Sequence, residues 1–162
     1  MFPGFTRPGD FFLSMKKPYT PRSIRTLAMD LLARREHTEQ ELRQKLKIRE
    51  HSPNAIDEVL QALQQDRLQS DTRFTESYVN HRVNAGIGPV KIRYELRQKG
   101  IDDLLANEFL EPFCSQWDEM MERQRIRKYG EAIPTDYRES MKQARFLQNR
   151  GFSGEAVMRL FR

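Results

Sequence analysis

The sequence predicts an all-α protein in which three tandem three-helix repeats form an elongated, curved, solenoid-like monomer. The first observation is repetition: the pentapeptide ELRQK at 41–45 recurs unchanged at 95–99, and a weaker copy follows around Leu147. Repeats of a few tens of residues indicate small stacked units that share an extended surface. The second is composition, because 38% hydrophobic residues and a mean hydropathy of −0.79 leave little apolar area for one deep core. The third is that no stretch shows the strict alternation of a strand.

The chain divides into four segments. Residues 1–20 have a high density of proline and glycine, which favours a disordered leader. Helical patterns then predict a first three-helix repeat at 21–69, a second at 70–111 and a third at 112–162.

Each helix of the first repeat has a start signal or an apolar stripe. The first helix carries five apolar residues at helical spacing: Ile24, Leu27, Ala28, Leu31 and Leu32. The second begins at a capping box, in which the Thr38 hydroxyl and the Glu41 carboxylate would satisfy free backbone amides. It turns two leucines inward, Leu42 and Leu46. The third begins with an N-cap serine and a proline at 52–53 and buries another stripe: Ile56, Val59, Leu60 and Leu63.

The second repeat follows the same plan. Gly88 and Pro89 open its second helix, and Gly100 ends that helix because glycine tolerates the left-handed backbone conformation. Asp102 is placed to cap the third helix. The inward residues predicted for the three helices in turn are Phe74 and Tyr78, then Ile92 and Leu96, then Leu105 and Phe109.

The third repeat begins near Phe113, and its first helix ends where glycine and proline break the chain between 128 and 135. Its second helix ends at Gly151, in the same way that the second helix of the previous repeat ends at Gly100. The apolar residues at helical spacing are Trp117, Met120, Met121, Met141, Ala144, Leu147, Val157, Leu160 and Phe161.

The sequence contains no pattern typical of an enzyme, cofactor or metal site. Neither H-E-x-x-H nor C-x-x-C occurs, and His37, His51 and His81 lack metal-ligand spacing. We expect His37 and His51 to be solvent-exposed. The single cysteine, Cys114, lies among apolar residues and is expected to be a buried, inert thiol. The sequence therefore predicts no catalytic residue, no metal ligand and no cofactor.

The charge of the chain suits an acidic partner. There are 28 Lys and Arg residues against 23 Asp and Glu, a net charge of +5, which favours contact with a polyanion or an acidic protein surface. No apolar run reaches the roughly 18 residues of a membrane span, and the start lacks a signal-peptide pattern. The sequence therefore predicts a cytoplasmic protein without membrane contact.

Basic residues recur on the second helix of each repeat. If the repeats place these helices on one side, the residues form a basic ridge suited to phosphates or to the acidic groove of a protein filament. The alternative is a set of solvated helix faces, whose ion pairs contribute roughly 0.2–0.5 kcal/mol each. The residues are Arg43, Lys45, Lys47 and Arg49, then Lys91, Arg93, Arg97 and Lys99, then Lys142, Arg145 and Arg150.

Several stretches together resemble the RecX family in their order and spacing. They are LARREHTEQEL at 32–42, GIGP at 86–89 with IRYEL at 92–96 and KGI at 99–101, and RKYGE at 127–131 followed by IPT at 133–135. RFL at 145–147 and RGF at 150–152 continue the match, which runs from about Ile24 to the end of the chain.

This resemblance implies a negative modulator of the RecA recombinase. RecX proteins lie in the helical groove of the RecA–DNA filament, block its extension and inhibit ATP hydrolysis, strand exchange and coprotease activity. The expected partner is therefore the RecA filament, with single- or double-stranded DNA as a second candidate. A basic helical DNA-binding protein that does not need RecA is the alternative function. The residues expected to contact filament or DNA are Arg43, Lys45, Arg93, Arg97, Lys99, Arg127, Lys128, Arg145 and Arg150.

Overall fold

The computed structural model describes residues 21–48 and 51–161, so the predicted leader at 1–20 lies outside the described residues. Within these ranges the chain is all-α, with nine α-helices, one 3₁₀ helix and no strand, as predicted. The elements are α1 (Pro21–Leu32), α2 (Glu39–Lys47), α3 (Pro53–Gln65), α4 (Asp71–Asn84), α5 (Pro89–Gln98), α6 (Asp103–Leu110), the 3₁₀ helix η1 (Glu111–Gln116), α7 (Trp117–Tyr129), α8 (Tyr137–Asn149) and α9 (Gly154–Leu160).

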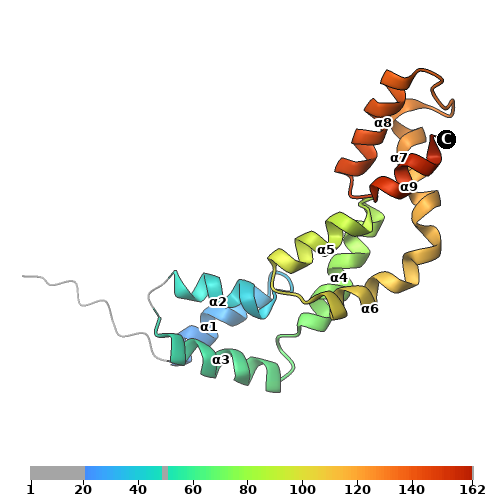
Figure 1. Ribbon diagram of the computed structural model, residues 1–162. Helices are drawn as coiled ribbons and strands as arrows, with labels where there is room; N and C mark the ends of the chain where they lie inside the picture. Colours follow the sequence, from blue (N-terminus) through green and yellow to red (C-terminus); the bar gives the residue numbers. More distant parts are fainter. Residues whose placement is uncertain (1–20, 49–50, 162) are drawn as a thin grey trace, which may run out of the picture.

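Three groups of three helices follow one another along an elongated, curved molecule (Figure 1). The groups are α1–α3, α4–α6 and α7–α9, and η1 connects α6 to α7. The second helices, α2, α5 and α8, all lie on the inner side of the curve. The helices to which the sequence assigns the basic residues therefore share one side of the molecule.

Side-chain caps define the starts of six of these helices. Thr38, Ser52 and Asp102, the three predicted caps, accept hydrogen bonds from the backbone N–H groups of Glu41, Ala55 and Leu105. A cap of this kind typically contributes about 1 kcal/mol to helix stability. Three further helices begin in the same way, at Ser70, Asp136 and Ser153.

The apolar core of the described chain is divided into two clusters. One belongs to α1–α3 and contains Ile24, Ala28, Leu42, Leu46, Ile56, Val59, Leu60 and Leu63. The other extends from Phe74 in α4 to Val157 in α9 and includes Leu96 of α5 and Leu147 of α8. Repeats two and three therefore share a core, whereas repeat one has a core of its own.

The burial prediction for Cys114 is wrong, and the one for α6 is confirmed only in part. The predicted inward residues Leu105 and Phe109 pack against the core but are half-buried, while Ala106 and Leu110 are fully buried. α6 packs against both α4 and α5, so its buried stripe faces the gap between two helices. Cys114 is exposed, because it lies on η1, which has no buried residue.

The second helices meet end to end. At the junction of α8 with α5, the backbone N–H groups of Gly88 and Val90 donate to the carbonyls of Arg150 and Gly151, at 2.8 and 3.0 Å. At the junction of α5 with α2, the Thr38 hydroxyl donates to the Lys99 carbonyl at 2.7 Å. The last carbonyls of one helix are thus satisfied by the first turn of the next.

The same glycine geometry occurs at both junctions. Gly100 and Gly151 follow α5 and α8 with φ values of +83° and +96°, a conformation that favours glycine. A Cβ atom would lie 2.0 Å from Oε1 of Gln40 at the first position, and 2.2 Å from Cβ of Lys91 at the second. Each glycine therefore ends one helix and also admits the first turn of the neighbouring one.

Candidate partner-binding face

The structure brings seven of the nine predicted contact residues onto the line of second helices. Arg43 and Lys45 lie on α2, Arg93 and Arg97 on α5, and Arg145 on α8, while Lys99 and Arg150 are the C-caps of α5 and α8. Arg127 and Lys128 lie in the last turn of α7 instead. We call the residues on α2, α5 and α8 and their C-caps the basic ridge.

Most ridge cations in repeats one and two already have partners on the neighbouring helix. Arg43 of α2 forms ion pairs with Asp57 of α3 and, at 2.7 Å, with Glu39. The hydrogen bonds that Arg43 donates to these two carboxylates raise its pKa above the ordinary value. In repeat two, Arg97 pairs with Asp103 of α6 at 2.6 Å, and Arg93 donates to Asn107 at 2.8 Å. These side chains tie the second helix to the third helix of the same repeat.

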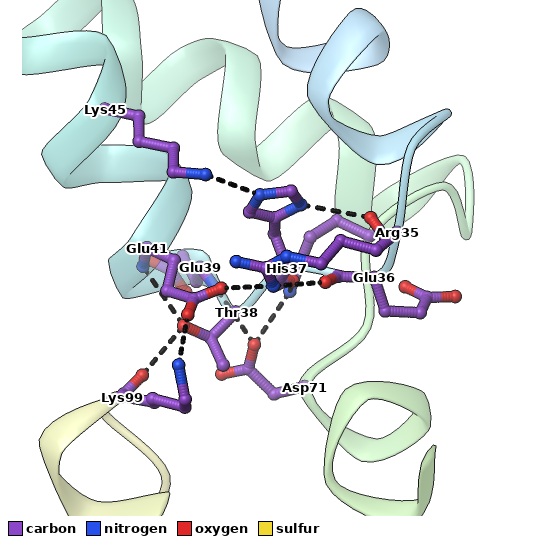
Figure 2. Close-up of polar contacts among 10 residues, drawn as sticks. Arg35, Glu36, His37, Thr38, Glu39, Glu41, Lys45, Asp71 and Lys99 are labelled. Carbon is purple, nitrogen blue, oxygen red and sulfur yellow. Dashed lines mark hydrogen bonds and ion pairs between the residues drawn. The ribbon is translucent and has the colours of Figure 1, made fainter. Parts of the chain in front are cut away.

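Lys99 joins repeat one to repeat two (Figure 2). Its ammonium lies 2.6 Å from Glu41 of α2 and also sits 5.8 and 5.6 Å from the ring centroids of Phe74 and Tyr78. The predicted capping box is therefore wrong in one respect, because the Glu41 carboxylate is engaged by Lys99 and Arg35. A charge reversal at Lys99 would disturb this junction as well as the surface.

The Glu41 carboxylate is ionised more readily than an ordinary glutamate. Burial acts to raise its pKa, but hydrogen bonds from Arg35 and Lys99 and the charges of both outweigh that effect and lower it. The ion pair with Lys99 is only 28% and 13% exposed on its two sides, so it is less screened than a surface pair.

His37 is buried, contrary to the prediction that it is solvent-exposed; only 1% of it is accessible, and His51 is buried as well. Lys45 can only donate, and its ammonium lies 2.8 Å from Nε2 of His37, so this nitrogen accepts. The opposite ring nitrogen, Nδ1, then carries the proton and donates to the Arg35 carbonyl at 3.0 Å (Figure 2). Burial, with the charges of Arg35 and Lys45, lowers the pKa of His37.

We expect acidification to destabilise repeat one through His37. Because the folded-state pKa is lowered, the unfolded chain binds the extra proton first, and stability falls as the pH drops below the ordinary histidine value of about 6.5. The Glu41 contribution is lost only below the ordinary glutamate value of about 4.3. Thermal unfolding measured from pH 8 to pH 5 should show this loss, and Lys45→Met, which removes the adjacent charge, should reduce it. An unfolding temperature that is flat over this interval would contradict the neutral assignment of His37.

Repeat three has several basic residues without an acidic partner, although Arg123, Lys142 and Arg159 form ion pairs. Among the described residues no carboxylate forms an ion pair with Arg127, Lys128, Arg138 or Arg145. The Lys128 ammonium instead lies 3.9 Å from the ring centroid of Phe146 on α8. Arg150 donates to Gln124 at 2.8 Å, and none of the described carboxylates forms an ion pair with it. Unmatched positive charge is therefore concentrated at the end of α7 and along α8.

An open groove of about 1090 Å³ lies between the end of α7 and α8, and its lining includes Lys128, Arg138 and Arg145. Tyr129 and Phe146 pack edge to face within it, with centroids 5.6 Å apart. Arg138 belongs to the groove but was not among the predicted contacts. The signal was present in the sequence, since positions 138, 142, 145 and 149 form one helical stripe. We call this feature the α8 groove, and its lining residues are Lys128, Tyr129, Asp136, Tyr137, Arg138, Glu139, Met141, Lys142, Arg145, Phe146 and Asn149.

The described residues show neither a metal site nor a membrane span. No group of three or more His, Cys, Asp or Glu side chains within them could hold a metal ion. None of the helices in this part of the chain is both long and apolar enough to cross a bilayer.

Three family models match successive parts of the chain. The models describe the first, second and third three-helix domains of RecX and match residues 25–63, 70–110 and 116–161. The regulatory protein RecX of Halorhodospira halophila is 44% identical over 135 residues, which cover 83% of this chain and 84% of that protein. The regulatory protein RecX of Pseudomonas savastanoi pv. phaseolicola is 41% identical over 141 residues, covering 87% of this chain and 91% of the relative.

Solved structures share the fold. A crystal structure of RecX from Lactobacillus salivarius superposes with a TM-score of 0.72 at 24% identity and covers 87% of this chain and 96% of its own. A crystal structure of a regulatory protein RecX gives a TM-score of 0.74 at 25% identity, covering 85% of this chain and 71% of its own.

Proposed function

The chain belongs to the RecX family, and from this premise we propose that it is a negative regulator of the RecA recombinase. In this proposal it binds in the groove of the RecA–DNA filament and inhibits filament extension, ATP hydrolysis, strand exchange and coprotease activity. It acts in the cytoplasm as a monomer, by binding and without catalysis or a cofactor.

The observation that carries the proposal is the alignment of α2, α5 and α8 on the inner side of a curved molecule (Figure 1). An elongated face can contact several filament subunits at once, and linked weak contacts raise the total affinity through effective concentration. Free RecA would offer only one of these contacts. The filament would therefore be bound in preference to the free subunit.

The ion pairs and hydrogen bonds of the proposed contact residues separate those that hold the fold together from those that are free to bind a partner. Arg43, Arg93, Arg97 and Lys99 hold helices and repeats in place, so they determine the shape of the face. Arg127, Lys128 and Arg145 have no acidic partner among the described residues, and we assign them to the contact itself. The wider set of predicted contacts, which also includes Lys45 and Arg150, remains a proposal.

The test is the single-stranded-DNA-dependent ATPase of RecA, titrated with this protein well below one molecule per RecA. We expect inhibition at these ratios, because one bound molecule should affect a filament of many subunits. The titration is then repeated with excess naked DNA as a competitor. Inhibition that survives the competitor supports filament binding, and its absence in both titrations would refute the proposed function.

The unmatched cations of repeat three favour one alternative, direct DNA binding without RecA. Phosphate contacts release counterions, so this alternative predicts affinity for naked DNA that falls log-linearly with salt concentration. It also predicts that the competitor DNA relieves the ATPase inhibition. Filament binding instead requires RecA and nucleotide.

A further inference from the structure

Repeat three carries a second groove beside the α8 groove. This second groove has a volume of about 490 Å³ and is lined largely by apolar side chains: Ile133, Pro134, Thr135, Tyr137, Ser140, Met141, Ala144, Met158 and Phe161. Tyr137 and Met141 line both grooves, so the two are continuous across α8. Together they form a surface that is basic on one side and apolar on the other.

Several apolar groups in the second groove are open to solvent. Tyr137 is 77% exposed and Ile133 51% exposed, and Met158 is also exposed. A single exposed apolar side chain is common on a protein surface and has no meaning by itself. Here three of them line one groove that adjoins the basic α8 groove, and an apolar patch rimmed by polar residues is typical of an interaction site.

A buried arginine holds the loop that carries the apolar side. Arg125 is 1% exposed, and its guanidinium donates to the carbonyls of Gly130, Glu131 and Ala132 at 3.1, 2.8 and 3.1 Å. These three residues lead directly into Ile133 and Pro134. The loop is therefore fixed before a partner arrives, which reduces the entropy lost on binding.

We propose that this two-sided surface binds an acidic, amphipathic peptide segment of a protein partner. Its carboxylates would meet Lys128 and Arg145 on the basic side, and its apolar side chains would cover Ile133, Tyr137 and Met158. This inference rests on the proposed function, because the segment is assigned to the filament protein. It adds which part of the molecule makes the contact and what chemistry the partner presents.

Nucleic acid fits this surface less well for two reasons. Tyr129 and Phe146 are half-buried against each other, and the Lys128 ammonium covers the ring face of Phe146, so neither ring is free to stack on a base. The apolar side would have no contact to make with phosphate or sugar.

The first test measures fluorescence anisotropy of two labelled probes with the full chain. One probe is a 14-residue peptide with Asp and Glu on one helical face and Leu on the other, and the second is oligo-dT of 15 nucleotides. We expect the peptide to bind and to be displaced by unlabelled peptide but not by oligo-dT. Failure of the peptide to bind, or its displacement by oligo-dT, would overturn the proposal.

Charge-reversal variants locate the binding. Lys128→Glu combined with Arg145→Glu should weaken peptide binding about tenfold or more, since it reverses both contact charges. The matched control combines Arg123→Glu with Arg159→Glu, which makes the same change in net charge in the same repeat but outside the two grooves. Ile133→Ser tests the apolar side and should weaken binding without any change of charge. If the control variant weakened peptide binding equally, the loss would be explained by the change in net charge alone, and the proposal would be overturned.

The RecA ATPase separates this inference from the function on which it rests. If the natural sequence does not inhibit RecA, the proposed function fails whatever the peptide does. If it inhibits and the Lys128→Glu, Arg145→Glu variant inhibits equally well, the function stands and the assignment of this surface is wrong. We expect the Lys128→Glu, Arg145→Glu variant to lose inhibition and the matched control to retain it.

Discussion

Gly88→Ala is expected to lower the free energy of unfolding of repeats two and three by about 3 kcal/mol. A Cβ atom at this position would lie 2.4 Å from both the carbonyl carbon and oxygen of Gly151, and 2.6 Å from the amide nitrogen of Phe152. All three are backbone atoms, so a change of side-chain rotamer cannot relieve the steric clash. Relief would require α5 and α8 to separate, which would break the hydrogen bonds from Gly88 and Val90. Denaturant unfolding followed by circular dichroism measures the effect.

The matched control for this prediction is Gly130→Ala. Gly130 has a φ of +88°, yet a Cβ atom there would have no neighbour within 4 Å. The control therefore carries only the backbone cost of a conformation, φ +88° and ψ 177°, that is essentially restricted to glycine, about 1–3 kcal/mol. Gly88 has an ordinary φ of −80°, so its cost is purely steric. If Gly88→Ala proves as stable as the natural sequence, the close backbone contact does not hold these repeats together.

The helices and their caps could be predicted because they depend on residues a few positions apart. Thr38, Ser52 and Asp102 each cap a helix through an amide three residues later, and the inward leucines follow from helical spacing. The junctions could not be predicted. The bond from Thr38 to Lys99 joins residues 61 positions apart, and it exists only once the repeats are stacked.

The role of each basic residue also depended on the tertiary structure. Arg97 and Arg145 look alike in the sequence, as basic residues on second helices. Arg97 is neutralised because it lies beside Asp103, the first residue of α6, whereas none of the described carboxylates forms an ion pair with Arg145. His37 was misjudged for a related reason. A short loop before a helix usually lies in solvent, but here Gln69 donates to its carbonyl and Lys45 to its ring.

Lys99→Met is expected to loosen repeat one from the rest of the molecule and to weaken RecA inhibition. The two repeats have separate apolar cores, so their relative position depends on polar contacts at the junction. Lys99 supplies the ion pair to Glu41, and the Glu39 N–H donates to Asp71 (Figure 2). Losing a half-buried pair and leaving Glu41 with Arg35 alone should cost about 2 kcal/mol, between the values for exposed and buried pairs.

Small-angle scattering and the RecA ATPase test this prediction together. A freer junction should broaden the distribution of maximum dimensions, and a face of variable curvature should bind the filament less tightly because its contacts are no longer held in register. Arg97→Met is the matched control, since it removes a neighbouring ion pair with Asp103 that is 61% and 52% exposed and should change stability by no more than about 1 kcal/mol. Unchanged scattering for Lys99→Met would mean that the hydrogen bonds of Thr38 and Asp71 fix the junction without the ion pair. If the distribution of maximum dimensions broadened while inhibition stayed intact, binding to the filament would restore the curvature that the free variant had lost.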